Sequence, residues 1–166
     1  MKADHLRELF RYHFDINQKI WEDTVSQLSD EQFTQNLPYS VGSVRNQLVH
    51  MIDIDNSWFR ILQGEPWTGT SDPTSFPDRE RVRLYWDQTI SLMKVILDQV
   101  EDETLASIFT PAFPFQVWQL YLHIIGHGID HRAQLLLMLN QLGVETIEQD
   151  YALYLLGGTW PSSIDL

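Results

Sequence analysis

Residues 117–142 read VWQLYLHIIGHGIDHRAQLLLMLNQL and form the longest mainly apolar run in the chain. Within it Leu120 and Ile124 belong to a set of apolar residues that recur at helical spacing, and a glycine follows Leu142 as a stop signal. The pattern predicts a helix from about Gln116 to Leu142. Because the run also contains three histidines, an aspartate and an arginine, we expect a buried helix rather than a membrane span.

Three further long helices are predicted from the same kind of periodicity. They are expected over residues 3–28, 43–63 and 78–100. Four helices of about 20–27 residues would each be about 30–40 Å long, so they can share one core over their whole length. No run of alternating β-branched residues competes with this pattern. We therefore expect an all-α fold, an antiparallel four-helix bundle with short extra helices, as a single domain over residues 1–166.

The segments between the long helices carry turn and capping signals. Ser29 begins the sequence Ser-Asp-Glu-Gln, a capping-box pattern that predicts a short helix before Pro38. Residues 64–77 are rich in Gly, Pro, Ser and Thr and are expected to form a long loop that packs over another part of the molecule. Residues 110–114 are expected to be an apolar loop, and 148–156 a last short helix.

The composition excludes several classes of function. The chain has 11 basic and 23 acidic residues, a net charge of −12, and beyond Arg83 only Lys94 and Arg132 are basic. No basic stripe is available for nucleic acid or for an anionic membrane surface. The absence of cysteine excludes disulfides and thiol nucleophiles. The charged start at residues 1–5 does not fit a signal peptide, so a cytoplasmic location is expected.

The histidines are the strongest candidates for chemistry. His123, His127 and His131 are four residues apart and share one helix face. An adjacent pair can direct its ring nitrogens at one cation, but all three cannot, because eight residues of helix rise about 12 Å. A further donor would come from His50 on the second long helix. Three imidazoles and an open position are typical of a catalytic zinc site, although nickel, copper or iron would also suit them.

A structural explanation of these histidines competes with the metal site. An inward histidine in a helical bundle is commonly hydrogen-bonded to a carbonyl group, and such a bundle would bind no metal. Gly126 and Gly128, on either side of His127, favour a special role for the segment, because each costs about 1 kcal/mol relative to alanine inside a helix. Such glycines indicate close backbone approach or room for a ligand.

The segment LHIIGHGIDHRAQ (residues 122–134), with the leucine-rich run up to Gly143, resembles the last core helix of the DinB family. That helix has a pattern close to His-Val-Val-Asn-His-Gly-x-x-His-Arg-Gly-Gln. Residues 43–51 (SVRNQLVHM) are similar to the family's second-helix histidine segment, and residues 12–21 are similar to part of its first helix. The resemblance covers nearly the whole chain.

This resemblance implies a four-helix bundle that holds a divalent metal, usually zinc or nickel. The residues that match the family's ligands are His50, His127 and His131. His123 matches a family histidine outside this triad. A homodimer is implied as well.

The chain departs from the family pattern at a few positions. Gly126 stands in place of the usual Asn and Ala133 in place of a Gly, and residues 14–17 read FDIN where Trp-Ala-Asn is common. These differences concern the substrate pocket rather than the ligands.

The expected chemistry is that of a metal-dependent, thiol-using S-transferase. Relatives in the family include transferases and isomerases that use low-molecular-weight thiols such as bacillithiol or mycothiol, and without cysteine this chain would take its thiol from such a cofactor. The partners would be a small-molecule thiol and an electrophile. Two alternatives remain open, a non-catalytic metal-binding dimer of the stress response and a metal-dependent hydrolase. No glutamate follows His127 as in His-Glu-x-x-His, which argues against a zincin-like protease.

Other side chains near the histidines have two interpretations each. Arg132 is expected to be solvated or to form a salt bridge between helices, and the functional alternative is a clamp for a substrate carboxylate. Asp53 and Asp130, three residues after His50 and His127, would either orient a ligand imidazole or lie on the surface. Five large aromatic residues are expected in the core or in a subunit contact: Trp58, Trp67, Trp86, Trp118 and Tyr121.

Overall fold

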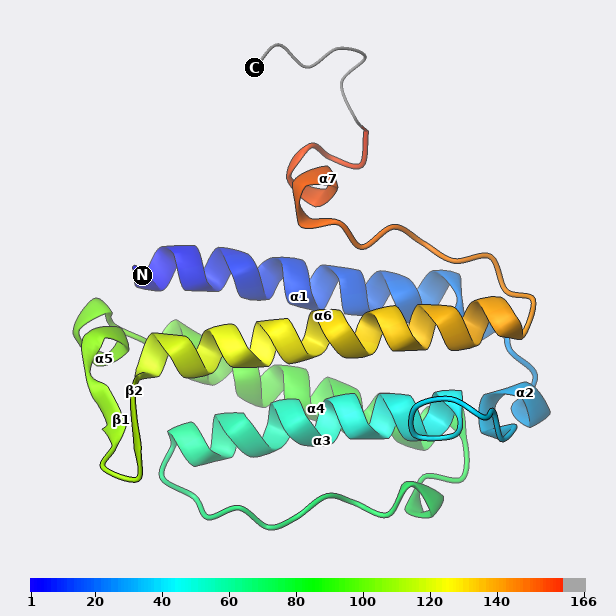
Figure 1. The fold of residues 1–166 in the computed structure, drawn as a ribbon, viewed down its shortest axis with the longest axis horizontal. Coiled ribbons are helices and arrows are strands. Elements are labelled where there is room, and N and C mark those ends of the chain that lie inside the picture. The colour runs from blue at the N-terminus through cyan, green and yellow to red at the C-terminus, as the bar shows by residue number, and fades with distance from the viewer. Residues whose placement is uncertain (160–166) are drawn as a thin grey trace.

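Four long helices dominate the computed structural model, which describes residues 1–159 (Figure 1). They are α1 (Ala3–Asp23), α3 (Val44–Leu62), α4 (Arg79–Asp98) and α6 (Val117–Gln141). In Figure 1, α1 and α6 run in one direction and α3 and α4 in the opposite direction. The all-α fold is confirmed, and its four-helix bundle consists of two parallel pairs that are antiparallel to each other.

Short elements connect the long helices of the described chain, and one more follows the last long helix. They are η1 (Val25–Gln27), α2 (Asp30–Thr34), η2 (Pro73–Ser75), α5 (Asp102–Ala106) and α7 (Tyr151–Leu155). The capping box predicted at Ser29 is present, since its hydroxyl accepts from the backbone N–H of Gln32 and the Gln32 side chain accepts from Ser29. The first helix ends at Asp23, five residues before the predicted end at Leu28, because the chain tightens there into a 3₁₀ turn.

One segment differs from its predicted structure. Residues 110–114 were expected to be a loop, yet they form the turn and parts of a small antiparallel ribbon of β1 (Ile108–Thr110) and β2 (Phe113–Gln116). Strands of three and four residues are too short to show an alternating pattern in the sequence. Stacking of Phe109 on Phe115 across the ribbon, with ring centroids 6.1 Å apart, is a contact that only the folded hairpin creates.

The long connection between α3 and α4 runs back along the bundle, as its length and composition predicted (Figure 1). The buried carboxylate of Asp53 holds it in place. It accepts hydrogen bonds from the backbone N–H and the hydroxyl of Ser71, at 2.7 and 2.8 Å, and from the hydroxyl of Tyr85 on α4 at 2.7 Å. Burial and this carboxylate raise the pKa of Tyr85 well above its ordinary value, so the phenol remains a donor.

The apolar core consists of two clusters along the bundle axis. One, at the α2 end, includes Trp21 and Trp86, whose rings meet edge to face at 5.4 Å. The other, at the hairpin end, is centred on Phe10, Phe59 and Tyr121. Buried polar residues lie near the boundary of the two clusters, namely His13 and Asn17 on α1, Asp55 on α3, Thr89 on α4 and Arg132 on α6.

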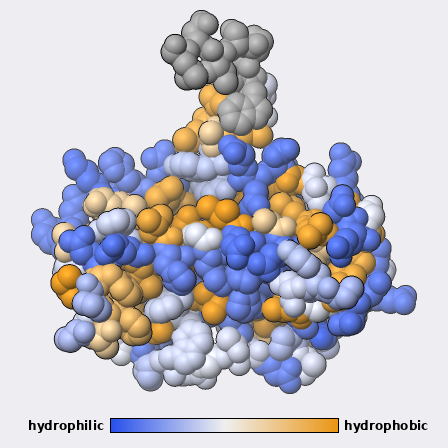
Figure 2. Space-filling model, in the orientation of Figure 1, coloured by the Kyte–Doolittle hydropathy of each residue, from blue (hydrophilic) through white to orange (hydrophobic). Residues whose placement is uncertain are grey.

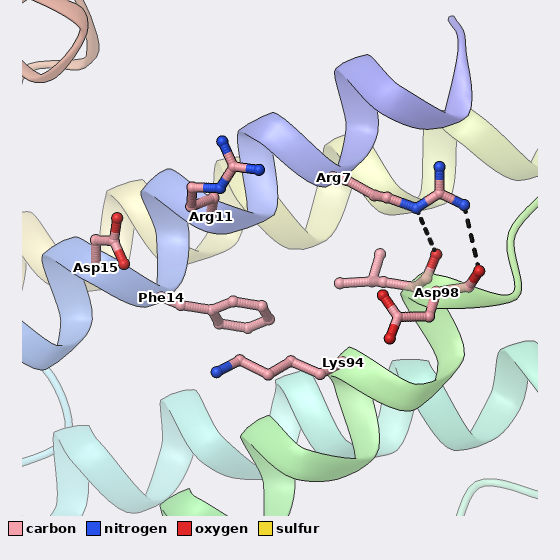
Figure 3. A pocket seen from close by; sticks show the side chains of 7 residues that line it. Arg7, Arg11, Phe14, Asp15, Lys94 and Asp98 are labelled. Carbon is pink, nitrogen blue, oxygen red and sulfur yellow. Dashed lines mark hydrogen bonds between the residues drawn. The ribbon is translucent and has the colours of Figure 1, made fainter.

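Arg7 joins the start of α1 to the end of α4 (Figure 3). Its guanidinium donates to the carbonyl oxygens of Leu97 at 3.1 Å and Val100 at 2.7 Å. A cation at these carbonyls also complements the negative end of the helix dipole. The adjoining cavity of about 320 Å³ has both signs of charge, with Lys94 and Asp98 among its lining residues. We therefore regard Arg7 as a clamp between helices.

Apolar side chains gather on the outer face along α6 and over the hairpin (Figure 2). On α6, Leu122, Ile129 and Leu137 are 45%, 41% and 42% exposed. On the hairpin, Ile108 and Phe113 are 58% and 47% exposed. None of the helices in the described part of the chain combines the length and apolar composition needed to span a bilayer.

Candidate metal centre

Three predicted ligands, His50 on α3 and His127 and His131 on α6, lie together where these two antiparallel helices meet. Each offers one ring nitrogen such that these atoms all lie within 4.8 Å of one another. The ring centroids are 4.1 Å apart for His127 and His131, 4.5 Å for His50 and His131, and 5.2 Å for His50 and His127. The geometry therefore selects the pair His127 and His131 over the pair His123 and His127.

Local structure explains how these side chains are positioned. The four-residue spacing on α6 puts His127 and His131 on one face, one turn apart. On α3 the hydroxyl of Ser43 accepts a hydrogen bond from the backbone N–H of Asn46 at 3.1 Å and so defines the helix start. His50 then lies two turns into α3. All three rings are half-buried, which leaves one side of the cluster open to small molecules.

The electrostatics of the cluster favour neutral imidazoles, the form that binds metals. Burial, and after it the neighbouring His131, lower the pKa of His127 to about 4 against the opposing effect of Asp55. Burial and His50 lower the pKa of His131 below its ordinary value. Burial also lowers the pKa of His50, against the opposing effect of Asp53. At neutral pH the three rings present lone pairs rather than three positive charges.

One nitrogen in the cluster has no partner within the described protein. Nδ1 of His127 is buried and makes no hydrogen bond in the described part of the chain. A buried polar atom without a partner costs about 1–3 kcal/mol, so such atoms commonly mark a functional site. The three neutral imidazoles, one of which carries this nitrogen without a partner, fit a divalent ion of the zinc and nickel type.

Gln47 holds the ring of His131 from the second turn of α3. Its fully buried side-chain nitrogen lies 2.8 Å from Nδ1 of His131 and donates to the backbone carbonyl of the same residue at 3.2 Å. A half-turn of the Gln47 amide exchanges its NH2 group, a donor, with its oxygen, an acceptor. The contact with Nδ1 of His131 can therefore form with either tautomer of the ring. Sequence reasoning missed Gln47, although it precedes His50 by three residues on the same helix face.

The two aspartates expected near the ligands do not hydrogen-bond to them. Asp53 is directed at Ser71 and Tyr85, as described above. Asp130 is exposed and accepts from the side chain of Gln134 at 3.2 Å. Both carboxylates act on the imidazoles only through space, since Asp53 raises the pKa of His50 and Asp130 that of His131.

Arg132 is neither solvated nor part of a salt bridge in the described chain, contrary to the prediction. It is fully buried (0% exposed) and donates to Oε1 of Gln149 at 3.0 Å, to Nδ1 of His13 at 3.1 Å and to Oδ1 of Asn17 at 3.2 Å. Because Arg132 donates to Nδ1 of His13, the ring proton lies on Nε2, 3.0 Å from Asp55. No substrate carboxylate reaches a guanidinium in this position.

His123 and the five large aromatic residues singled out in the sequence differ in how deeply they are buried. His123 is exposed, one turn from the cluster, with its ring centroid 6.3 Å from that of His127. Of the five aromatic residues expected in the core or a contact, Trp86 and Tyr121 are buried, Trp58 and Trp118 are half-buried, and Trp67 is exposed on the connection after α3.

A cavity of about 200 Å³ opens beside the cluster, and His50 itself lines it. Its other walls carry the polar side chains of Asn46, Thr70 and Ser71 together with Val41, Val49, Asp53 and Pro73. It therefore gives access to His50 from the side of α3.

Comparison with known proteins gives a consistent result. The sequence model of the DinB family matches residues 1–159. An uncharacterized protein of Bacillus subtilis (strain 168), YizA, is 22% identical over 153 residues, which cover 88% of this chain and 93% of that protein. Protein DinB of the same organism is 24% identical over 174 aligned positions, covering 92% of this chain and 95% of that protein.

Proposed function

This chain belongs to the DinB family, and from that premise we propose that it is a metal-dependent enzyme that transfers a low-molecular-weight thiol to a small electrophile. His50, His127 and His131 would hold one divalent ion, zinc or nickel. The observation that carries the proposal is the convergence of three neutral imidazoles from two helices, one of which has a buried nitrogen without a partner.

A divalent ion with an open coordination position would favour the thiolate form of a bound thiol or lower the pKa of a bound water. The chain contributes position and surroundings. Gln47 orients the ring of His131, and the cavity beside His50 would admit the thiol. In the reaction the thiol releases its proton to solvent, its sulfur forms a bond to an electrophilic carbon, and the leaving group departs with the electrons of the broken bond.

The carboxylates of α3 and α6 near the cluster argue against the hydrolase alternative, which requires a general base. Asp53 accepts three hydrogen bonds from Ser71 and Tyr85, and Asp55 faces His13. Asp130 is exposed and bound to Gln134. Thiol transfer needs no such base in the protein, since a thiol with a lowered pKa ionises in neutral solvent.

The metal site is tested by titrating the metal-free chain with Zn²⁺ and with Ni²⁺ in a calorimeter. We expect one ion per chain, and about 100-fold or greater loss of affinity in His127→Ala, because two ligands do not make a stable site. His5→Ala, at the exposed start of α1, is the matched control and retains the affinity. Equal affinity in His127→Ala and the unchanged protein would refute the site.

The transfer reaction is tested separately by incubating the metal-loaded chain with a small thiol and an activated aryl halide. We expect thioether formation that falls to the uncatalysed rate in His127→Ala. Bound metal without turnover across a panel of thiols and electrophiles would instead favour the non-catalytic metal-binding protein.

We also propose that the chain forms a homodimer. The exposed apolar residues on the outer face of α6, Leu122, Ile129 and Leu137, support this arrangement, because monomeric proteins rarely leave such a row uncovered.

A further inference from the structure

A second cavity, of about 390 Å³, lies between α3, α6 and the hairpin. Its lining residues are Trp58, Phe113, Phe115, Gln119, Leu120 and His123. Its volume falls in the range of small-molecule sites, about 300–1,000 Å³. Four of its six lining side chains carry aromatic rings, and none carries a lysine or arginine charge.

The aromatic walls of this cavity come from the hairpin, from α3 and from α6. Phe113 and Phe115 lie with ring centroids 5.7 Å apart, and Trp58 meets His123 edge to face at 5.6 Å. Phe113 remains 47% exposed, an unfavourable state for a large apolar ring in water. A flat ligand between these rings would cover that surface and gain edge and stacking contacts with several of them.

The cavity adjoins the histidine cluster along the line where α3 and α6 meet. His123 belongs to its lining, and the ring of His123 is one helical turn from that of His127, with centroids 6.3 Å apart. On α3, Trp58 lies two turns beyond His50 in the same direction, towards the hairpin. The smaller cavity described above opens instead beside His50. One cavity therefore lies next to His50, and the aromatic cavity lies next to His123, one turn from His127.

We propose that the aromatic cavity binds the flat, uncharged ring of a small aromatic molecule, and that in the reaction proposed above this molecule is the electrophile. The assignment of the electrophile rests on the proposed function, whereas binding of the ring does not. Aromatic walls favour a planar group, and the lack of basic residues together with the net charge of −12 disfavours an anion. His123 and Gln119 supply polar contacts at the rim.

The test uses 1-naphthol as the probe, titrated into the full-length chain with and without metal, with calorimetry and the ring-proton NMR signals of the histidines as readouts. We expect binding in both forms and a ring-current shift of His123. Phe113→Ser should weaken binding about 10-fold, and because this side chain is exposed the chain should still fold. Trp67→Ala, an exposed aromatic residue outside the cavity, is the matched control and should bind like the unchanged protein.

A second probe tests planarity. Decahydro-1-naphthol has the same skeleton and hydroxyl but is not flat, and it should bind about 10-fold more weakly than 1-naphthol. Equal binding of the two probes, or equal binding by Phe113→Ser and Trp67→Ala, would overturn the proposal. A chain that binds metal but not 1-naphthol rejects this cavity alone, whereas one that binds 1-naphthol but no metal rejects only the proposed function.

Discussion

His127 combines two properties that separate it from an ordinary core histidine. Its Nδ1 is buried without a partner in the described chain, and burial together with His131 lowers its pKa to about 4. A buried histidine that serves packing alone would be expected to have hydrogen-bond partners at its ring nitrogens, as a buried polar group normally does. His13 illustrates that case, since both of its ring nitrogens are engaged by Asp55 and Arg132.

The lowered pKa of His127 predicts a pH dependence of the free energy of unfolding. Below its ordinary value of 6.5 the ring takes up a proton in the unfolded chain, but in the folded metal-free chain it stays neutral until about pH 4. Since the unfolded state binds more protons in this window, stability is retained above pH 6.5 and is lost as the pH falls towards 4. His50 and His131, whose pKa values are also lowered, act in the same direction.

Urea denaturation of the metal-free chain at pH 7 and pH 5 measures this effect. His127→Gln should lose less stability between the two pH values than the unchanged protein, because the substituted side chain does not titrate. His5→Gln should lose as much as the unchanged protein. Equal losses in all three chains would contradict the burial of a neutral imidazole at position 127.

Helix α6 carries two glycines with different surroundings. A Cβ atom on Gly128 would lie 2.5 Å from Cε1 and 2.8 Å from Nδ1 of His13, whereas nothing lies within 4 Å of a Cβ on Gly126. His13 cannot move aside cheaply, because Asp55 and Arg132 hold its ring. Gly128 therefore permits the close approach of α1 that the sequence suggested, and Gly126 does not serve this purpose.

This difference predicts opposite effects of the same substitution. Gly126→Ala should stabilise the chain by about 1 kcal/mol, because alanine has the higher helix propensity. Gly128→Ala should destabilise it by about 1–3 kcal/mol, because the added methyl overpacks the contact with His13. Urea denaturation of the three chains at one protein concentration gives both values. Stabilisation by both substitutions would show that His13 does not pack against α6 as described.

Across the molecule, a layer of buried polar side chains separates the two apolar clusters and connects three helices to the segment after α6. Arg132 reaches His13 and Asn17 on α1, and it also reaches Gln149. The backbone carbonyl of Gln149 accepts from the hydroxyl of Tyr12 at 2.5 Å. This network fixes the register of the helices along the bundle axis, because a shift of one helix along another would separate the polar groups from their partners.

The outer face of α6 suits a two-fold symmetric contact with a second copy. Leu122 and Leu137 lie seven and eight residues from Ile129, on opposite sides of it. Antiparallel packing of two α6 helices about Ile129 would place Leu122 of one copy against Leu137 of the other, and a two-fold interface requires such self-complementarity.

Sedimentation tests the proposed dimer. The unchanged protein should have twice the chain mass of 19.5 kDa, and Ile129→Glu should have the mass of one chain because it buries a charge at the centre of the contact. Val95→Glu replaces an exposed apolar residue on α4 and should leave the dimer intact. A monomeric unchanged protein, or a dimeric Ile129→Glu, would exclude this interface.

The helices and the spacing of the histidines could be predicted from local patterns. A 3.6-residue period predicts α3 and α6 well, and Ser43 marks the start of α3, since these signals act within one or two turns. The same period places His127 and His131 one turn apart on one face. The short strands of the hairpin escaped prediction, because three or four residues carry too little periodicity.

Other features depend on how the helices pack together. The periodicity of α6 allowed His123 with His127 as readily as His127 with His131, and only the register of α3 against α6 brings His50 to the second pair. The burial of Arg132 and the supporting contact of Gln47 likewise arise from neighbours distant in sequence. Residue spacing reports the face of a helix, but the free energy of close packing and of satisfying buried polar groups selects which faces meet.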